Sequence, residues 1–229
     1  MARASRTSHI QSRRGSTNTV HELSELPFGA TLHSVRATPV EIEGRPALRV
    51  SLTDAVARDG VPDVDYHDEP TFVRIPADFK SGTIEFDVRS RLTDAAPEYA
   101  RAFAGLAYRI NRLGNRFECV YLRPMNGRPL DPPAPRDARA VQYFAYPDWK
   151  FDRLRSEFPD GPYEAGADIL PDTWIHVRLE IAQSAVRLIL DGALVLHIPQ
   201  TLTKPSRGDI GLWVDIGTEA YFSHLVITP

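Results

Sequence analysis

The chain of 229 residues is predicted to fold as an all-β jelly-roll sandwich of two antiparallel sheets. Its last quarter carries the clearest signal, because hydrophobic and polar residues alternate there with the period of two that a sheet with one buried face requires. In the first such stretch Ile175, Val177 and Leu179 share one side. Asp191 and Gly192 form the residue pair of a tight hairpin turn. The four stretches are residues 174–182, 186–192, 209–215 and 220–227.

The remaining strands follow from the same alternation earlier in the chain. Two of them are joined by a short loop that contains Gly114 and Asn115, which indicates a hairpin. Two long irregular segments, 124–137 and 147–171, are rich in proline, aromatic and charged residues. Loops of this length are uncommon in compact domains unless they shape a site or are disordered, and we expect them over the concave face of the sandwich. The remaining strands are expected at residues 47–52, 71–75, 82–89, 103–110, 116–123 and 140–146.

Composition limits the domain count and the class of partner. A hydrophobic share of 42% allows a buried core, and sandwiches of this size are commonly single units, so residues 21–229 are interpreted as one domain. Residues 1–20 hold four arginines and no acidic residue, and are predicted to be a basic disordered arm. The net charge of −3 provides no general attraction for nucleic acid or an anionic membrane. No apolar run reaches the length of a bilayer span or of an export signal, so we expect a cytoplasmic protein.

Cys119 is the single cysteine, which excludes an intramolecular disulfide and a zinc site with several thiolates. It lies within the apolar stretch 116–122, where a buried thiol is the usual state. The acidic segment 59–70 is broken by prolines and lacks the ligand spacing of a calcium loop, so it is interpreted as a solvated surface loop. We therefore predict neither a metal site nor a cofactor.

One charged pair is the candidate for chemistry. Arg109 alternates with Gly105 and Ala107, and such small residues suggest an open, concave surface. Glu118 lies on the next strand, so pairing around the hairpin would place both charges on the same face. The pair has two interpretations: a cross-strand ion pair, or a catalytic site in which Glu118 acts as acid or base while Arg109 orients a hydroxyl or stabilises an oxyanion.

Further side chains on neighbouring strands and loops are expected to complete this surface. Sugars are bound by planar polar groups together with an aromatic ring under the apolar face of the pyranose. The reaction is not fixed, because no Gly-x-Ser-x-Gly elbow, phosphate loop, dinucleotide fingerprint or His-Glu-x-x-His motif is present. The predicted substrate-binding residues are Asp87, Tyr121, Arg123, Gln142, Tyr146, Trp149, Arg153 and Tyr163.

The order of these motifs resembles the concanavalin A-like lectin/glucanase superfamily over roughly residues 70–228. The nearest branch is similar to the laminin G-like group that contains the 3-keto-disaccharide hydrolase domains. This resemblance implies a jelly roll whose concave sheet binds carbohydrate, and it carries over Arg109 and Glu118 as the functional pair. Relatives in that branch are usually exported, and their N-terminal Gly-Trp region has no counterpart before residue 50. The motifs lie at residues 82–88, 105–109, 117–118, 174–179, 190–192, 208–213 and 221–227.

Three functions are consistent with these sequence features. The first is a carbohydrate-directed protein that binds a glycoside on the concave sheet, either with or without cleaving it as a hydrolase or lyase. The second is an enzyme that isomerises, eliminates from or cyclises a less polar metabolite in the same cavity, since the fold does not dictate the function. The third is a binding module without catalysis. The oligomeric state is left open.

Overall fold

The computed structural model describes residues 18–229. Most of the arm predicted at residues 1–20 lies outside the described residues. The last part of that segment is not an arm, because Thr19–His21 forms strand β1 and pairs antiparallel with the C-terminal strand β15 (Thr218–Thr228). The four arginines of the segment all precede Thr19, where the chain joins the sheet that contains β15.

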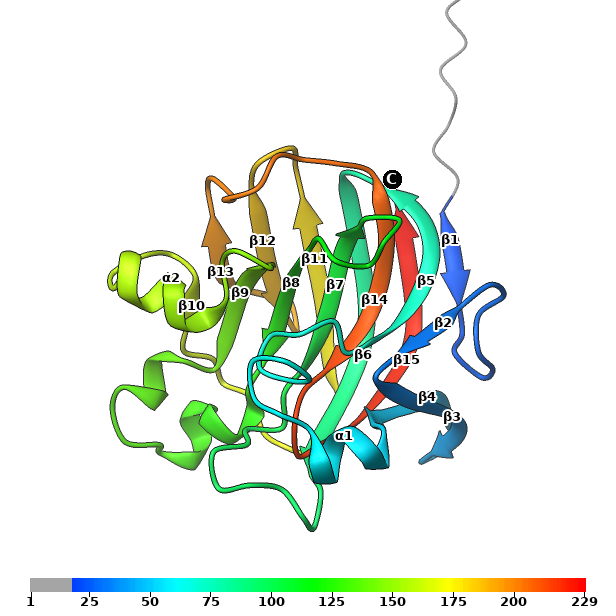
Figure 1. The fold of residues 1–229 in the computed structure, drawn as a ribbon, viewed down its shortest axis with the longest axis horizontal. Coiled ribbons are helices and arrows are strands. Elements are labelled where there is room, and N and C mark those ends of the chain that lie inside the picture. The colour runs from blue at the N-terminus through cyan, green and yellow to red at the C-terminus, as the bar shows by residue number, and fades with distance from the viewer. Residues whose placement is uncertain (1–17) are drawn as a thin grey trace, which may run out of the picture.

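Two antiparallel sheets pack face to face, which confirms the predicted jelly-roll sandwich (Figure 1). The eight-stranded sheet contains β1, β3 (Val35–Ile42), β4 (Arg45–Leu52), β6 (Gly82–Leu92), β11 (Ile175–Ile181), β12 (Val186–Leu190), β13 (Ala193–Ile198) and β15. Its order is β13-β12-β11-β6-β15-β4-β3, with β1 beside β15.

The seven-stranded sheet has the order β10-β9-β8-β7-β14-β5-β2. It contains β2 (Thr31–His33), β5 (Phe72–Phe79), β7 (Ala104–Ile110), β8 (Phe117–Leu122), β9 (Val141–Tyr146), β10 (Glu164–Ala165) and β14 (Gly208–Val214). Most of the predicted strands are present within one or two residues of their expected bounds, and the hairpin between β7 and β8 is confirmed.

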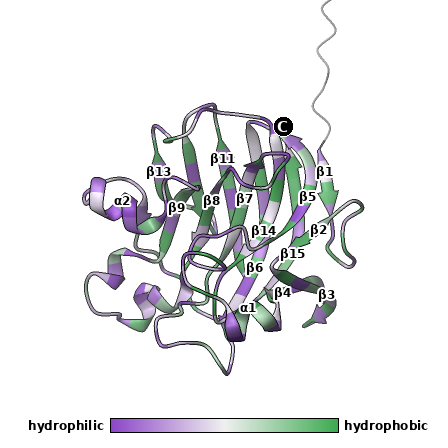
Figure 2. Cartoon of the chain, in the orientation of Figure 1, coloured by the Kyte–Doolittle hydropathy of each residue, from purple (hydrophilic) through white to green (hydrophobic). Residues whose placement is uncertain are grey.

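The alternation in the last quarter corresponds to one buried face. Ile175 and Val177 of β11 are buried, and the intervening side chains lie outside the core. Hydrophobic residues recur along the strands of both sheets, with hydrophilic residues between them (Figure 2). Asp191 and Gly192 adopt φ of 48° and 84°, the left-handed geometry that a two-residue hairpin turn needs. This turn leads into β13, a strand that the sequence patterns did not indicate.

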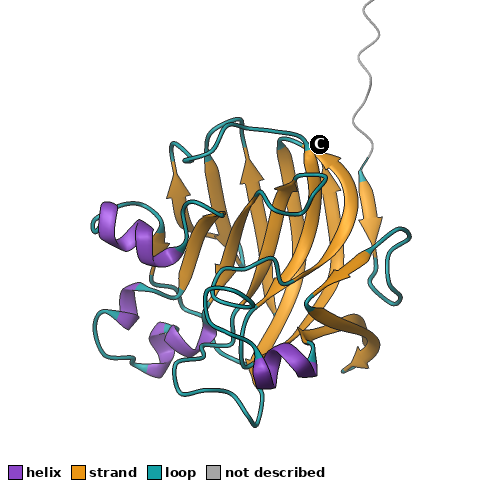
Figure 3. Cartoon of the chain, viewed as in Figure 1, coloured by secondary structure: helices purple, strands orange, loops and turns teal. Residues whose placement is uncertain are grey.

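Short helices lie at the rim of the sandwich (Figure 3). The segment 147–171 was predicted to be irregular, and this was wrong in part. It contains the helix α2 (Phe151–Glu157) and the strand β10, and both are too short to show a clear hydrophobic periodicity. None of the helices within residues 18–229 is long and apolar enough to cross a membrane. The helices are α1 (Asp54–Asp59) and α2 (Phe151–Glu157), with 3₁₀ turns η1 (Pro124–Asn126), η2 (Arg128–Leu130) and η3 (Arg136–Ala138).

The outer face of the seven-stranded sheet is covered rather than open. It carries aromatic rings such as Tyr121 and Trp213, whose centroids are 4.8 Å apart. The loop 60–71 between α1 and β5 packs on this face, and the Trp213 indole N–H donates to the Glu69 carbonyl at 2.8 Å. Asp68 and Glu69 are buried there. The prediction of a solvated surface loop was therefore wrong for its C-terminal part, because contacts with β14 replace solvent.

Candidate functional site

Arg109 and Glu118 form an ion pair in the interior, and each is only 2% exposed. The Arg109 Nη1 atom lies 2.7 Å from Glu118 Oε1. The other carboxylate oxygen accepts hydrogen bonds from the hydroxyls of Tyr143, at 2.7 Å, and Tyr108, at 3.3 Å. Both carboxylate oxygens therefore accept hydrogen bonds from protein groups.

The pair does not lie on the outer face as predicted. Glu118 is opposite Tyr108 in the β7–β8 register, so it shares the face of that buried ring. Simple alternation would turn Arg109 away from it, but a bulge against β14 and a φ of 56° at Arg109 reverse its direction. The guanidinium also donates to the carbonyls of Lys80 and Ala182, beside strands of the other sheet, at 2.8 and 2.7 Å. Arg109 therefore links the two sheets.

Asp87 does not belong to the same surface as the other predicted residues. It lies on β6 of the eight-stranded sheet, whereas the other predicted strand residues lie on or beside the seven-stranded sheet. Its carboxylate is 2.7 Å from the Arg45 guanidinium and 2.8 Å from His176 Nδ1. The prediction was wrong because alternation assigns a face within one strand but does not tell which sheet the strand joins.

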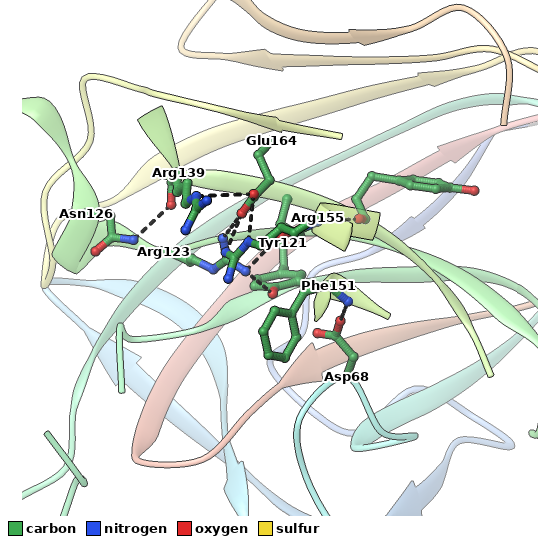
Figure 4. Close-up of polar contacts among 10 residues, drawn as sticks. Asp68, Tyr121, Arg123, Asn126, Arg139, Phe151, Arg155 and Glu164 are labelled. Atoms are coloured by element: carbon green, nitrogen blue, oxygen red, sulfur yellow. Dashed lines mark hydrogen bonds and ion pairs between the residues drawn. The ribbon is translucent and has the colours of Figure 1, made fainter. Parts of the chain in front are cut away.

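Three predicted residues meet in one buried network. The Arg123 Nη2 group donates to the Tyr121 hydroxyl at 2.6 Å and to Gln142 Oε1 at 2.9 Å. Its Nη1 group lies 2.6 Å from Glu164 Oε1. Figure 4 shows this guanidinium at the centre of the cluster. Strands β8 and β9 position the network, because Tyr121 and Gln142 are directly opposite each other in register.

Glu164 gathers further positive charge around this network. Arg155 of α2 approaches it at 2.6 Å and Arg139 at 3.4 Å (Figure 4). Burial opposes ionisation of Glu164, but hydrogen bonds from Arg155 and the charge of Arg123 outweigh it and hold its pKa below the ordinary value. Glu164 is therefore an ionised anchor for three arginines, which argues against its use as an acid.

A cavity of about 330 Å³ opens beside this network, and we call it the Arg123 cavity. Its volume lies at the lower end of the range for small-molecule sites. Four aromatic side chains form much of its wall, while charged groups reach it from several loops. Among its lining residues are Tyr99, Phe103, Tyr121, Phe151, Arg123 and Asp68.

Two buried carboxyl groups, Asp68 and Asp215, also line the Arg123 cavity. Asp215 accepts backbone N–H groups of His67, Asp68 and Ile216 at 3.1, 3.2 and 2.7 Å. Asp68 accepts the N–H of Phe151 at 2.8 Å, which satisfies the otherwise free first amide of α2 (Figure 4). Burial and the nearby charge of Asp215 raise the pKa of Asp68 to about 7. Burial also raises the pKa of Asp215.

A second cavity, of about 360 Å³, lies at the end of β8 and β9, and we call it the Trp149 cavity. It brings together Arg109, Glu118, Tyr146 and Trp149, four of the predicted residues. Arg153 of α2 stacks on the Trp149 ring, with 4.0 Å between the guanidinium carbon and the ring centroid. These five residues are neighbours, but they are separate from the Arg123 network, whereas the sequence predicted one shared surface.

Tyr163 belongs to neither of these two cavities. It lines a third cavity, of about 260 Å³, together with Gln142. Its ring stacks on Tyr143, with centroids 5.8 Å apart. The predicted residues other than Arg153 and Asp87 thus line three cavities along the seven-stranded sheet. Arg153 stacks on Trp149 beside one of them, and Asp87 lies on the other sheet.

The Arg123 cavity is the best candidate for the functional site. Buried polar groups that converge on a largely apolar cavity, one of them with a perturbed pKa, are typical of binding and active sites. In the Trp149 cavity the buried ionisable groups, Arg109 and Glu118, are occupied by each other and by neighbouring protein groups. Within residues 18–229 no group of three or more His, Cys, Asp or Glu side chains is arranged to hold a metal ion.

Several residues of the Arg123 cavity were not predicted from the sequence. Asp68 lies in the segment interpreted as solvated, and no local pattern distinguishes it from the other acidic residues there. Asp215 gave a usable signal, since it directly follows the buried strand β14. The missed side chains are His67, Asp68, Tyr99, Arg101, Phe103, Asn126, Arg136, Arg139, Phe151, Arg155 and Asp215.

Comparison with known proteins supports the fold. No family model matches the chain, and no curated protein matches its sequence. A protein of unknown function with a galectin-like fold from Bacillus subtilis superposes with a TM-score of 0.52 at 12% identity, over 92% of this chain and 94% of that one. The fold is that of concanavalin A-like lectins and glucanases. A Bacillus licheniformis β-glucanase superposes with a TM-score of 0.50 at 10% identity, over 94% of this chain and 98% of that one. The laminin G-like branch stays a prediction.

Proposed function

We propose that the protein binds a small carbohydrate in the Arg123 cavity. The observation that supports this function best is the combination of an aromatic wall with buried hydrogen-bonding groups in one cavity of about 330 Å³. Sugar rings present an apolar face to aromatic side chains and hydroxyls to planar polar groups. Tyr99 is half exposed at the rim, and Arg123 and Asp68 lie deeper, so the cavity offers both kinds of contact.

Cleavage of the bound sugar is a second candidate function, favoured by one observation. General acid catalysis is most effective when the pKa of the acid lies near the working pH, and Asp68 has a pKa of about 7. Asp215 would supply the second carboxyl group that glycoside cleavage commonly uses. Asp68 rather than Glu118 is then the acid, because the Glu118 carboxylate accepts hydrogen bonds from Arg109 and two tyrosines. Catalysis by Glu118 stays a prediction.

Isothermal titration calorimetry with a panel of monosaccharides and disaccharides tests the proposed function. We expect saturable binding by the wild type and a loss of about tenfold in affinity for Tyr99→Ala, since the ring packs against the sugar. Phe28→Ala is the matched control, because Phe28 is a fully exposed aromatic residue that does not line the cavity. The control should bind as the wild type does.

Two results would contradict the proposed function. Absence of binding for every sugar would exclude it, and saturable binding of an apolar metabolite would favour the alternative enzyme class. Cleavage is tested separately by chromatography of a disaccharide after incubation with wild type and Asp68→Asn. Product formation that survives this substitution would exclude Asp68 as the acid, while binding without any product by the wild type would indicate a non-catalytic module.

A further inference from the structure

The Arg123 cavity holds more positive than negative charge. Five arginines line it with two carboxyl groups, those of Asp68 and Asp215, and Glu164 beside the cavity supplies a third. Even with all three ionised, the arginines are in excess, and the pKa of about 7 for Asp68 means that this carboxyl is partly protonated near neutral pH. The five arginines are Arg101, Arg123, Arg136, Arg139 and Arg155.

The excess charge is concentrated on two of the arginines. Arg123, Arg139 and Arg155 share Glu164, at 2.6 to 3.4 Å. No carboxylate within residues 18–229 lies within 4.0 Å of the guanidinium nitrogens of Arg101 or Arg136.

Arg101 is held in place by backbone rather than by an opposite charge. Its Nη1 group donates to the carbonyls of Glu98 and Ala100, at 2.6 and 2.7 Å. Burial and the positive charge of Arg136 lower the pKa of Arg101, the Glu98 carboxylate opposes them, and the charge of Arg123 lowers it further. This guanidinium is positioned by neutral carbonyls and repelled by the neighbouring arginines. An anion that binds to it would therefore stabilise it.

We propose that the ligand of the Arg123 cavity is a sugar that carries an acidic group, bound by Arg101 and Arg136. This inference rests on the proposed function and names its substrate class. The planar fork of a guanidinium matches the two oxygens of a carboxylate or phosphate, and charge-assisted bonds of this kind are stronger than bonds to a neutral hydroxyl. In this arrangement the aromatic side chains contact the sugar ring, while Arg101 and Arg136 bind its acidic group.

Matched pairs of ligands test the proposal by titration calorimetry. Glucose is compared with glucuronate and with glucose 6-phosphate, and galactose with galacturonate; inorganic phosphate is measured alone. We expect at least one acidic sugar to bind the wild type about tenfold or more tightly than its neutral partner, because hydrogen bonds to charged groups contribute more. The carboxylate and phosphate arms distinguish which acid is preferred.

Two variants locate the effect on the arginines. Arg101→Gln and Arg136→Gln should each reduce affinity for the acidic sugar about tenfold, and reduce affinity for the neutral sugar by a clearly smaller factor. Arg58→Gln is the control, because Arg58 is an exposed arginine on α1 paired with Asp59 and away from the cavity. Unfolding curves confirm that all three variants are folded before they are titrated.

The outcomes separate this inference from the proposed function. Equal affinity for acidic and neutral sugars, or a preference that survives both substitutions, would overturn the inference and leave sugar binding intact. Phosphate alone binding as tightly as glucose 6-phosphate would overturn the sugar part and indicate a simple anion site. If no sugar of either kind binds, the proposed function and the inference both fail.

Discussion

Replacing Asp68 by Asn should change how the stability of the protein depends on pH. The carboxyl group is 1% exposed, and burial together with Asp215 raises its pKa to about 7. The same group in the unfolded chain has an ordinary pKa near 3.8. Between these two pH values the folded protein keeps a proton that the unfolded chain releases, so the free energy of unfolding falls as the pH rises.

The size of the effect follows from the two pKa values. The ionised form of Asp68 costs the folded state on the order of 4 kcal/mol once the pH exceeds 7, and nothing below about pH 4, where the group is protonated in both states. Asn has the same shape without the charge, and its carbonyl can still accept the Phe151 N–H. We therefore expect Asp68→Asn to be more stable than the wild type above pH 7, by up to about 4 kcal/mol, with the gain disappearing toward pH 4.

Urea denaturation followed by tryptophan fluorescence from pH 4 to pH 8 measures this difference. Asp160→Asn is the control, because Asp160 is exposed in the loop after α2, and it should follow the wild type at every pH. A free energy of unfolding for Asp68→Asn that runs parallel to the wild type, or a gain that grows toward low pH, would refute the assignment of a raised pKa to Asp68.

Three further predictions concern groups outside the Arg123 cavity. Glu118→Ala leaves the buried charge of Arg109 without its partner and should lower the free energy of unfolding by about 3–5 kcal/mol in urea titrations; a loss below about 1 kcal/mol would show that the pair does not stabilise the fold. Cys119 is buried with a raised pKa, so a thiol reagent should label it only in denaturant, and rapid labelling of the native protein would contradict its placement. Gly105→Ala should lower the melting temperature sharply or prevent folding, because its Cβ would collide with the Val120 carbonyl; an unchanged melting temperature would contradict the close approach of β7 and β8.

The position of a strand within the fold could be predicted only in part. For β11 the alternation was sufficient, since Ile175 and Val177 are buried and their neighbours are not. The strand β6 shows the limit, because alternation correctly indicated which of its residues share a side but could not indicate its sheet. Asp87 was therefore assigned to the wrong surface. Pairing between strands distant in sequence decides the sheet, and no local pattern records it.

The candidate site was predicted least well where the backbone departs from regular geometry. Arg109 and Glu118 do meet, but a bulge at Arg109 directs the pair away from the outer face. Tyr121 and Gln142 lie on regular, adjacent strands, and Arg123 directly follows the first of them. Alternation indicates which side chains share a face of each strand, but a long irregular segment joins these two strands, so no local pattern indicates that they pair.

The sequence by itself determined the sandwich, because burial of alternate residues and turn chemistry such as that of Asp191 and Gly192 act between near neighbours. Only the tertiary structure decided where the site lies. The loop 60–71 folds back over the outer face through hydrogen bonds with β14, which places Asp68 beside Asp215, 147 positions later in the chain. The same packing buries both carboxyl groups and raises their pKa values. Solvent exclusion by distant segments creates this electrostatic environment, and it has no counterpart in local sequence.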